Sequence, residues 1–306
     1  MYELRQPAAE LSTYIDNYWF VTSTANNPVD LSVDVFVDGR CDLIFNFGAP
    51  YQREVIGGAT REIAASNLDA QRLYPIRITQ RGLVRTTGVR FCLGGLGVFT
   101  QIALREITNE TVEPARVFGS NTDALETTLR AEPDLDTQAR ALDAFFMAAL
   151  QRTPAYTTFE QALVASVAAK GNASVAELAE TAGVSPRQLE RSFSRYLGFP
   201  PKMLARVLRF QQALRALMQD PGTTLAEVST QAGYFDQAHF IKDFRRLSGG
   251  VPGGYRGYFP AAGPDDFAPN KVVFLQDADP SLGLDAPSEA REAHDDEFTV
   301  GERYKG

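Results

Sequence analysis

Residues 224–246, TLAEVSTQAGYFDQAHFIKDFRR, decide the fold of the C-terminal third, and residues 174–196, SVAELAETAGVSPRQLERSFSRY, repeat their pattern. Each segment opens with a hydroxyl residue, Ser174 or Thr224, and carries a glutamate three positions later, a pairing that caps the start of a helix. A glycine stands nine positions after each hydroxyl residue, where it can end the helix in the left-handed conformation. Two helices joined by a tight glycine-containing turn form a helix-turn-helix, so the sequence predicts two such units in tandem.

The second helix of each unit is predicted to bury one face and to expose the other. The apolar positions that we expect to be buried are Leu189, Phe193, Tyr196 and Leu197 in the first unit and Phe240, Phe244 and Leu247 in the second. The positions off these faces, free to enter a DNA groove, include Arg187, Gln188, Glu190, Arg191 and Arg195 in the first unit and Gln237, Ala238, His239, Lys242, Arg245 and Arg246 in the second. Arginine suits the acceptor edge of guanine, glutamine suits adenine, and a small side chain such as alanine suits a thymine methyl group. For any one of these residues, the alternative is that it belongs to a solvent-exposed polar face and makes no contact with DNA.

The charge distribution singles out the same region. The chain has 306 residues and a net charge of −8, yet residues 155–262 carry 12 Lys and Arg against 8 Asp and Glu. Residues 1–154 carry 14 basic and 19 acidic side chains, and residues 263–306 carry 4 and 11. A basic module between two acidic segments favours double-stranded DNA as its partner, because the DNA backbone is negatively charged.

The run 233–246 and the following GGVPGGYR, residues 249–256, resemble the signature that closes AraC/XylS-type DNA-binding domains. The sequence between the units matches that pattern at Arg209 and Ala213, and residues 202–218 are predicted to form one helix that holds the units apart. One departure is Gly250-Val251, where the family usually has threonine before the proline.

This resemblance implies that both units bind successive major-groove segments on one face of DNA. It places Arg187, Glu190 and Arg191 at bases in one segment, and Gln237, Ala238, His239 and Lys242 at bases in the other. The resemblance assigns phosphate contacts to Arg195, Arg245 and Arg246, and such contacts position the protein without specifying sequence.

The first half of the chain has the period-two alternation of β-strands. Strands are predicted at residues 29–37, 41–47, 53–56, 75–80 and 87–91, with a turn at Asp38-Gly39-Arg40. Leu96, Phe99, Ile102 and Ala103 fit one face of a short helix, and residues 121–150 have helical spacing. These patterns predict an α+β protein with an N-terminal, cupin-like β sandwich or barrel and a few helices, followed by an all-α tandem helix-turn-helix domain.

Several N-terminal motifs, residues 18–20, 37–45, 57–58, 88–91 and 94–95, resemble a β-rich domain of unknown function found ahead of AraC-type modules. The family usually has proline where this chain has Leu93. The resemblance implies sensing or dimerisation. Trp19, Arg40 and Arg90 are candidates to line a pocket for an anionic or aromatic ligand, with plain structural roles as the alternative.

The sequence argues against an enzyme in this half. No histidine precedes His239, which excludes a histidine metal site and a nucleophile–histidine pair there. Cys41 and Cys92 stand in apolar, strand-like surroundings, where inert buried thiols are more common than reactive ones. We expect no cofactor and no metal. A DNA-tethered enzyme stays one alternative, and an interaction adaptor without a small ligand is another.

The expected organisation is a sensor or dimerisation domain at 1–120, a helical connector at 121–153, the DNA-binding domain at 154–258 and an acidic, flexible tail at 259–306 with a short apolar run at 272–275. No apolar run reaches the length of a membrane span, and residues 1–5 lack the charged and apolar regions of a signal peptide, so a cytoplasmic regulator is expected. Further candidate partners are a small-molecule effector, a second copy of the chain and RNA polymerase. The sequence leaves activation and repression open.

Overall fold

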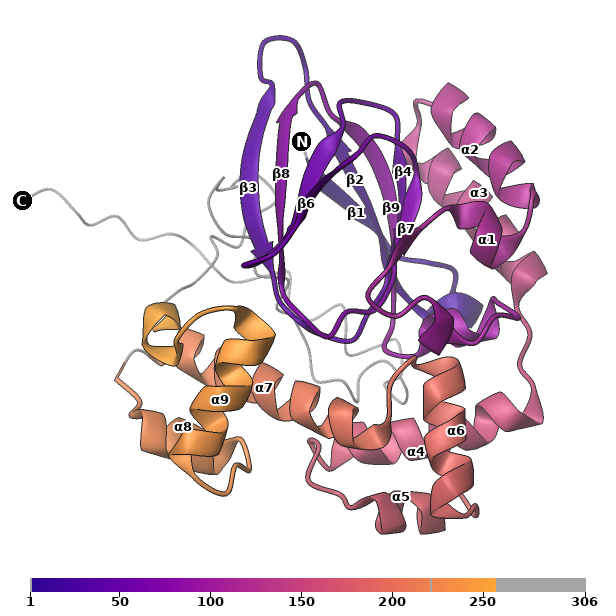
Figure 1. Cartoon of the computed structure of the whole chain (residues 1–306). Coiled ribbons are helices and arrows are strands. Elements are labelled where there is room, and N and C mark those ends of the chain that lie inside the picture. The colour runs from indigo at the N-terminus through magenta and orange to yellow at the C-terminus, as the bar shows by residue number, and fades with distance from the viewer. Residues whose placement is uncertain (1, 221, 257–306) are drawn as a thin grey trace, which may run out of the picture.

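The computed structural model describes residues 2–220 and 222–256, which form a β-rich N-terminal half and a helical C-terminal third (Figure 1). In Figure 1 the strands make up the upper part of the molecule, helices α1 to α3 lie along one side of them, and α4 to α9 lie below. The predicted α+β class is confirmed. The predicted acidic tail, with its apolar run at 272–275, lies outside the described residues.

The larger sheet contains six strands in the order β1-β2-β9-β4-β7-β10, all antiparallel to their neighbours. Its strands are β1 (Tyr2–Arg5), β2 (Ile15–Thr22), β9 (Arg85–Phe91), β4 (Asp42–Asn46), β7 (Asn67–Asp69) and β10 (Thr111–Val112). Side chains alternate between its two faces. Tyr18 and Phe20 of β2 are buried in the main core, whereas Trp19 between them lines a cavity on the other face.

The smaller sheet has the order β3-β8-β5-β6, also antiparallel, and its inner face lies opposite the larger sheet. Its strands are β3 (Val29–Val35), β8 (Ile76–Gly82), β5 (Tyr51–Val55) and β6 (Thr60–Ile63). Within the described residues no ladder joins the two sheets, so the β half is a sandwich rather than a closed barrel. The predicted strands correspond to β3, β4, β5, β8 and β9; the remaining five strands were not predicted.

The predicted short helix over Leu96–Ala103 is wrong. The chain forms two 3-10 turns instead, Gly95–Val98 and Leu104–Glu106. Gly94, Gly95 and Gly97, at the start of this region, disfavour an α-helix. The backbone is also held very close to Tyr14, the residue before β2, because a Cβ atom on Gly95 would lie 2.1 Å from the carbonyl oxygen of Tyr14.

The predicted helical region 121–150 contains two helices, α2 (Asn121–Ala131) and α3 (Leu135–Ala149), after the short α1 (Pro114–Phe118). Pro133 stands in the break between α2 and α3, where it cannot continue the first helix. These helices cover one face of the larger sheet. The Tyr18 hydroxyl donates to Asp143 of α3 at 2.8 Å, and the Thr87 hydroxyl donates to Gln138 of α3 at 2.6 Å.

The C-terminal third contains α4 (Pro154–Ala168), α5 (Val175–Thr181), α6 (Pro186–Tyr196), α7 (Pro201–Gln219), α8 (Leu225–Gln231), α9 (Gln237–Ser248) and a 3-10 turn, Pro252–Tyr255. One hydrophobic core runs through both halves of the molecule. An aromatic contact joins the halves, because Tyr14 meets Tyr156 of α4 with ring centroids 6.0 Å apart. Within the helical third, Phe159 of α4 meets Phe193 of α6 at 5.1 Å. The helical third is therefore packed against the sandwich and not merely tethered to it.

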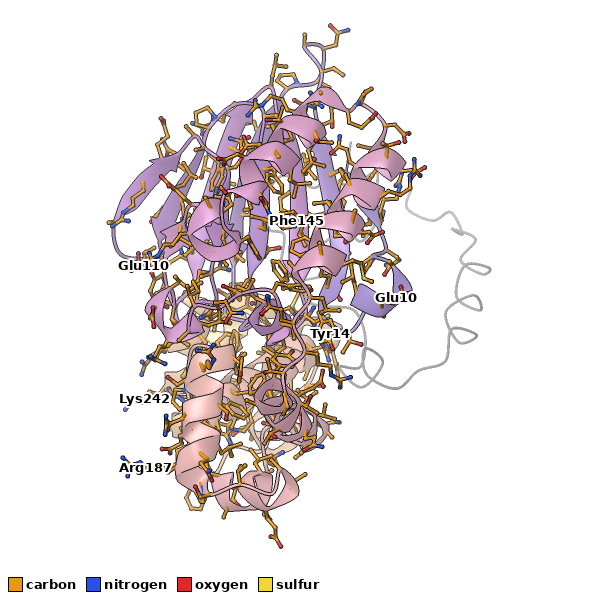
Figure 2. The ribbon with its side chains drawn as sticks, turned by 90° about the vertical axis from the view of Figure 1, so that its right-hand side faces the viewer. Glu10, Tyr14, Glu110, Phe145, Arg187 and Lys242 are labelled. Carbon is orange, nitrogen blue, oxygen red and sulfur yellow. The ribbon has the colours of Figure 1, made fainter. Side chains whose placement is uncertain are left out.

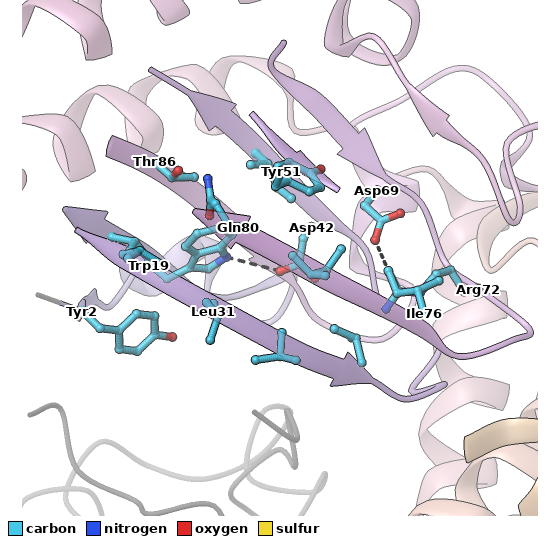
Figure 3. A pocket seen from close by; sticks show the side chains of 16 residues that line it. Tyr2, Trp19, Leu31, Asp42, Tyr51, Asp69, Arg72, Ile76, Gln80 and Thr86 are labelled. Carbon is cyan, nitrogen blue, oxygen red and sulfur yellow. Dashed lines mark hydrogen bonds and ion pairs between the residues drawn. The ribbon is translucent and has the colours of Figure 1, made fainter. Parts of the chain in front are cut away.

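Between the two sheets lies a second, small hydrophobic cluster around a cavity of about 120 Å³ (Figure 3). Trp19 lines this cavity, and its Nε1 donates to the Asp42 carboxylate at 3.3 Å. The indole lies against Gly88, its cross-strand neighbour on β9. A Cβ atom at position 88 would lie 1.9 Å from the indole ring, so only glycine fits beneath Trp19.

We expect Gly88→Ala to reduce the free energy of unfolding by about 1–3 kcal/mol, the usual cost of overpacking a well-packed site. Chemical denaturation followed by circular dichroism measures this loss. The fluorescence of Trp19, the single tryptophan of the chain, should shift in the same variant because the ring has to move. Gly253→Ala is the control, since a Cβ atom there meets nothing within 4 Å. Equal stability of the two variants would contradict the assigned packing.

Candidate nucleic-acid interface

Both predicted capping boxes are present. The backbone N–H of Glu177 donates to the Ser174 hydroxyl at 3.2 Å, and the N–H of Ser174 donates to the Glu177 carboxylate at 2.7 Å. Thr224 and Glu227 make the same reciprocal pair at 3.2 and 2.8 Å. Hydrogen bonds from the cap residues lower the pKa of both glutamates from their ordinary value. The prediction that these residues start the first helix of each unit is confirmed.

A third capping box changes the expectation for Gln188. Ser185 is the N-cap of α6 with Pro186 at the first helical position. In addition, the Gln188 side-chain oxygen accepts from the Ser185 backbone N–H at 2.9 Å and from its hydroxyl at 2.9 Å. Gln188 is exposed, but its acceptor atom is engaged in the cap, so in this conformation the amide cannot contact adenine through both of its polar atoms.

The two faces of α6 are separated as expected. Leu189 and Phe193 are fully buried, and Tyr196 and Leu197 are nearly so. Arg187, Glu190 and Arg191 are exposed. The first unit therefore presents two guanidinium groups and one carboxylate near the start of its second helix, which is the end that recognition helices normally direct at base edges.

Arg195 lies apart from these residues. It is only partly exposed, and its guanidinium donates to the backbone oxygen of Gln101 in the N-terminal half at 3.3 Å. The same group lies over the ring of Tyr196, 5.4 Å from its centroid. In this structure Arg195 therefore contacts the sandwich half of the molecule.

Helix α9 follows the same plan. Asp236 caps it by accepting from the backbone N–H of His239 at 2.7 Å. Phe240, Phe244 and Leu247 are fully buried. The exposed residues of α9 are Gln237, Ala238, His239, Lys242, Arg245 and Arg246. Phe235, which the sequence analysis left without a role, is 95% exposed just before this helix.

A buried ion pair fixes α9 on α7. Asp243 is almost completely buried and accepts from Arg206 Nε at 3.0 Å and from Arg206 Nη2 at 2.6 Å. The hydrogen bond to Asp243 raises the pKa of Arg206. Sequence reasoning missed this pair, because Asp243 has only the pattern of one more polar residue on an amphipathic helix. The partner stands 37 positions away, and helical spacing gives no signal for such a contact.

Helix α7 also fixes the two units relative to each other. Arg209 donates to the carbonyl oxygen of Gly171, just before the first unit, at 3.1 Å. Its guanidinium lies 5.5 Å from the ring centroid of Tyr234 in the second unit. The units also approach directly, since a Cβ atom on Gly233 would lie 2.2 Å from the side-chain oxygen of Asn172.

The second helices of both units present their polar residues on the same side of the molecule. Figure 2 shows Arg187 of α6 and Lys242 of α9 projecting from one edge. The connecting helix α7 has 19 residues, which corresponds to a length of about 28 Å. Successive major-groove segments on one face of B-DNA are about 34 Å apart, so a helix of this length separates the units by a comparable distance.

The structure separates the three candidates for a ligand pocket. Trp19 lines the cavity, whereas Arg40 and Arg90 do not. Arg40 is paired with Asp16 at 3.3 Å, and Arg90 is buried between Asp38 and Asp42. Both arginines sit in ion pairs because a buried guanidinium needs a carboxylate to offset its desolvation.

The arginine that does line the cavity is Arg72, which the sequence analysis missed. It is 5% exposed and paired with Asp69 of β7. Its position after a short polar strand carries no periodic signal.

Burial raises the pKa of the Cys41 thiol, which stabilises the protonated, unreactive form.

Within residues 2–220 and 222–256, no three His, Cys, Asp or Glu side chains come together as a metal site. Among the helices of these residues, none combines the length and the apolar character that a membrane crossing requires.

Comparison with known families identifies two regions. Residues 178–258 match the family described as "Helix-turn-helix domain", and residues 3–113 match "Domain of unknown function (DUF6597)". Both resemblances predicted from the sequence are thereby confirmed.

Two curated relatives are each 37% identical to this chain over 79 residues, and these residues make up 26% of the chain. They are "HTH-type transcriptional regulator GlxA" of Rhizobium meliloti (strain 1021) and "Uncharacterized HTH-type transcriptional regulator YidL" of Escherichia coli (strain K12). The match spans 24% of the first relative and 26% of the second, about a quarter of each.

Solved structures are similar at a lower level. The AraC-type DNA-binding domain of a regulator from Chromobacterium violaceum covers 35% of this chain and 96% of its own, at 27% identity and a TM-score of 0.33. ToxT from Vibrio cholerae covers 78% of this chain and 97% of its own, at 9% identity and a TM-score of 0.41.

We expect Asp243→Asn to lower the free energy of unfolding by about 2 kcal/mol, because a charged hydrogen bond is lost and an amide N–H₂ faces the donors of Arg206. Denaturant unfolding measures the loss. Glu190→Gln makes the same chemical change at an exposed position and should leave stability nearly unchanged. If both variants are equally stable, the ion pair does not hold α9 in place.

Proposed function

We propose that this chain, whose residues 178–258 match a helix-turn-helix family, is a sequence-specific DNA-binding transcription regulator of the AraC type. The observation that carries this proposal is the pair of amphipathic helices α6 and α9, whose basic faces lie on one side of the molecule. Each helix is buried on its apolar face and capped at its exposed end, and α7 holds the two apart. Such a rigid pair suits two consecutive major-groove segments.

Within this proposal the exposed residues divide into two roles. Arg187, Glu190 and Arg191 of α6 read bases in one segment, and Gln237, Ala238, His239 and Lys242 of α9 read bases in the next. Arg245 and Arg246, in the last turn of α9, contact phosphates. Gln188 orders the start of α6 through its capping bond and reads a base only if that bond opens. Arg195 reaches phosphate only after leaving Gln101.

We propose that the N-terminal half controls DNA binding, through a small ligand or through pairing with a second copy of the chain. The cavity between the sheets supports the ligand alternative. We propose the domain organisation that the sequence predicts: a sensor or dimerisation domain over 1–120, a connector over 121–153 and the DNA-binding domain from 154. The exposed residues 151–155, which lead into α4 and form its first two positions, support that boundary, whereas the end at 258 and the tail at 259–306 lie beyond the described residues. RNA polymerase is a further proposed partner.

We propose that the protein is a regulator without catalytic activity and that it acts in the cytoplasm, where bacterial DNA is found. Removal of an alkyl group from DNA by transfer to the protein would require an activated cysteine. Cys41 is buried, and its pKa is raised by that burial, which opposes formation of the nucleophilic thiolate. The alternative of a DNA-tethered enzyme therefore has no supporting observation at Cys41.

The first test of DNA binding is its salt dependence. If several Lys and Arg side chains neutralise phosphates, the logarithm of the affinity should fall by about 0.9 per phosphate contact for each unit of log salt. Fluorescence anisotropy of the full chain with DNA from a random-sequence selection gives this slope. Affinity that does not respond to salt, or failure to select any DNA, would refute the proposed function.

The second test separates base reading from phosphate contacts. Arg191→Ala and Gln237→Ala should each cost about 1–3 kcal/mol on the selected site and relax the preference at one local position. Arg245→Ala should weaken cognate and unrelated DNA alike and reduce the salt slope by about one. Arg245 is the matched control because it is exposed on α9, whereas Arg195 contacts Gln101. Selection profiles at fixed salt decide the matter. Unchanged preferences in the first two variants would remove these residues from the base-reading set.

A further inference from the structure

The cavity between the sheets has the makings of a ligand site. Its wall is mostly aliphatic and aromatic, with Trp19 on one sheet and Leu31, Val33 and Val35 of β3 on the other (Figure 3). An engineered cavity of about 150 Å³ with such a lining binds benzene. A cavity of about 120 Å³ is therefore of the size of one small ring, and a ring slightly larger than benzene fills it only by moving its walls apart.

The polar end of the cavity specifies one feature of the ligand. Arg72 lines the cavity, is 5% exposed and is paired with Asp69 through one of its terminal nitrogens. Among the described residues its Nε–H has no hydrogen-bond partner. A buried donor without a partner costs free energy, which a ligand with an acceptor atom can recover. Asp69 is shared with Arg53, and the carboxylates of Asp38 and Asp42 also interact with Arg72. Three carboxylates thus balance the three buried arginines Arg53, Arg72 and Arg90, so the site favours a neutral acceptor over a free anion.

The strand that forms one wall of the cavity, β3, leads directly to residues that contact the DNA-binding domain. Strand β3 ends at Val35, and the next residues, Phe36 and Val37, are buried in the main core against the second helix-turn-helix unit. Phe36 meets Phe210 of α7 at 6.5 Å and Tyr255 at 5.3 Å between ring centroids.

The backbone of Val37 makes hydrogen bonds to α9 of the second unit and to the connecting helix α7. Its N–H donates to the carbonyl oxygen of Leu247 in α9 at 3.4 Å, and its carbonyl oxygen accepts from the Gln211 side chain of α7 at 2.6 Å. The last turn of α9 and the middle of α7 therefore rest on the residue that follows the cavity wall.

We propose that this cavity binds a small, mainly apolar molecule with one neutral hydrogen-bond acceptor, and that Phe36–Val37 transmits its occupancy to α7 and α9. This inference rests on the proposed function and adds the chemistry of the effector and the contact that relays it. A molecule between the sheets displaces β3, because the opposite wall is braced by α1 to α3. The displaced strand carries Phe36 and Val37 with it and loosens the contacts to Leu247 and Gln211.

The first experiment tests the site with cyclohexanone, which combines a six-carbon apolar ring with one carbonyl acceptor. Trp19 is the only tryptophan, so its fluorescence reports cavity occupancy in the full chain. We expect a saturable change that is lost in Val33→Phe, where the added ring fills the cavity. Val21→Phe, at a less buried position on the cavity wall, provides a second filling variant if Val33→Phe does not fold. A non-saturable response, or one that persists in a folded filling variant, would overturn the site.

The second experiment tests the relay without DNA. Cyclohexanone should raise amide hydrogen exchange in the last turn of α9 by about tenfold, within the range of ordinary coupling between sites. In Gln211→Ala the exchange should be raised already and should not respond further. Gln212→Ala is the control, because its side chain bonds within the helical third, to Lys170 and Leu208, and the response should persist. A full response in Gln211→Ala, or saturation of Trp19 without any exchange response in the unmodified chain, would overturn the relay.

The DNA measurement distinguishes this inference from the proposed function. Affinity is measured for a selected site and for the same site with the segment read by α9 randomised. Cyclohexanone should change the ratio of these two affinities by about fivefold or more. No change on a site that the protein does bind would overturn regulation through α9. Absence of all DNA binding together with a positive exchange response would refute the proposed function and support the cavity and its relay.

Discussion

A buried arginine, Arg90 of β9, fixes the place where the two halves of this protein meet. Its guanidinium lies between the carboxylates of Asp38 and Asp42, and all three groups are largely shielded from water. Burial alone would raise the pKa of Asp38, but the guanidinium groups of Arg90 and Arg72 lower it below its ordinary value. Asp42 also accepts from Trp19 in the cavity, and Asp38 follows Val37, which contacts α7 and α9. The turn between the sheets depends on this arginine, since two buried carboxylates without it would repel each other.

The turn that Arg90 stabilises is one of the surfaces against which the helix-turn-helix units pack. The second unit rests on Phe36 and Val37, and the first is held by the turn after α6, where the carbonyl oxygen of Gly198 accepts from the Thr108 hydroxyl at 3.0 Å. A Cβ atom on Gly39 would lie 3.1 Å from Phe199, so the turn at residues 38–40 is packed against the start of the segment leading into α7. Contacts with the sandwich therefore fix the positions of both units, and a conformational change in the sandwich can alter either unit through these contacts.

Local patterns predicted the helical third well. Capping boxes, glycines after short helices and apolar spacing all act within a few residues, so the sequence contains the whole cause of each helix. The same reasoning failed where the cause is distant. Strand β7 is three residues of mixed character, Asn67–Asp69, and exists because β4 and β10 lie on either side of it. The turns near Gly95 do not form an α-helix because the backbone of Tyr14, just before β2, lies against Gly95.

The sequence by itself determined the two helix-turn-helix units, the exposed basic side chains on their second helices and the alternating strands of the sandwich, since each follows from periodicity and short-range capping. Only the tertiary structure decided which arginine does what. Arg40, Arg90, Arg195 and Arg206 have similar signals in the sequence, yet one pairs with Asp16, one braces a turn, one contacts Gln101 and one holds α9. A long cationic side chain takes its role from the acceptors within its reach, and in these four cases the acceptor lies between 24 and 94 positions away along the chain.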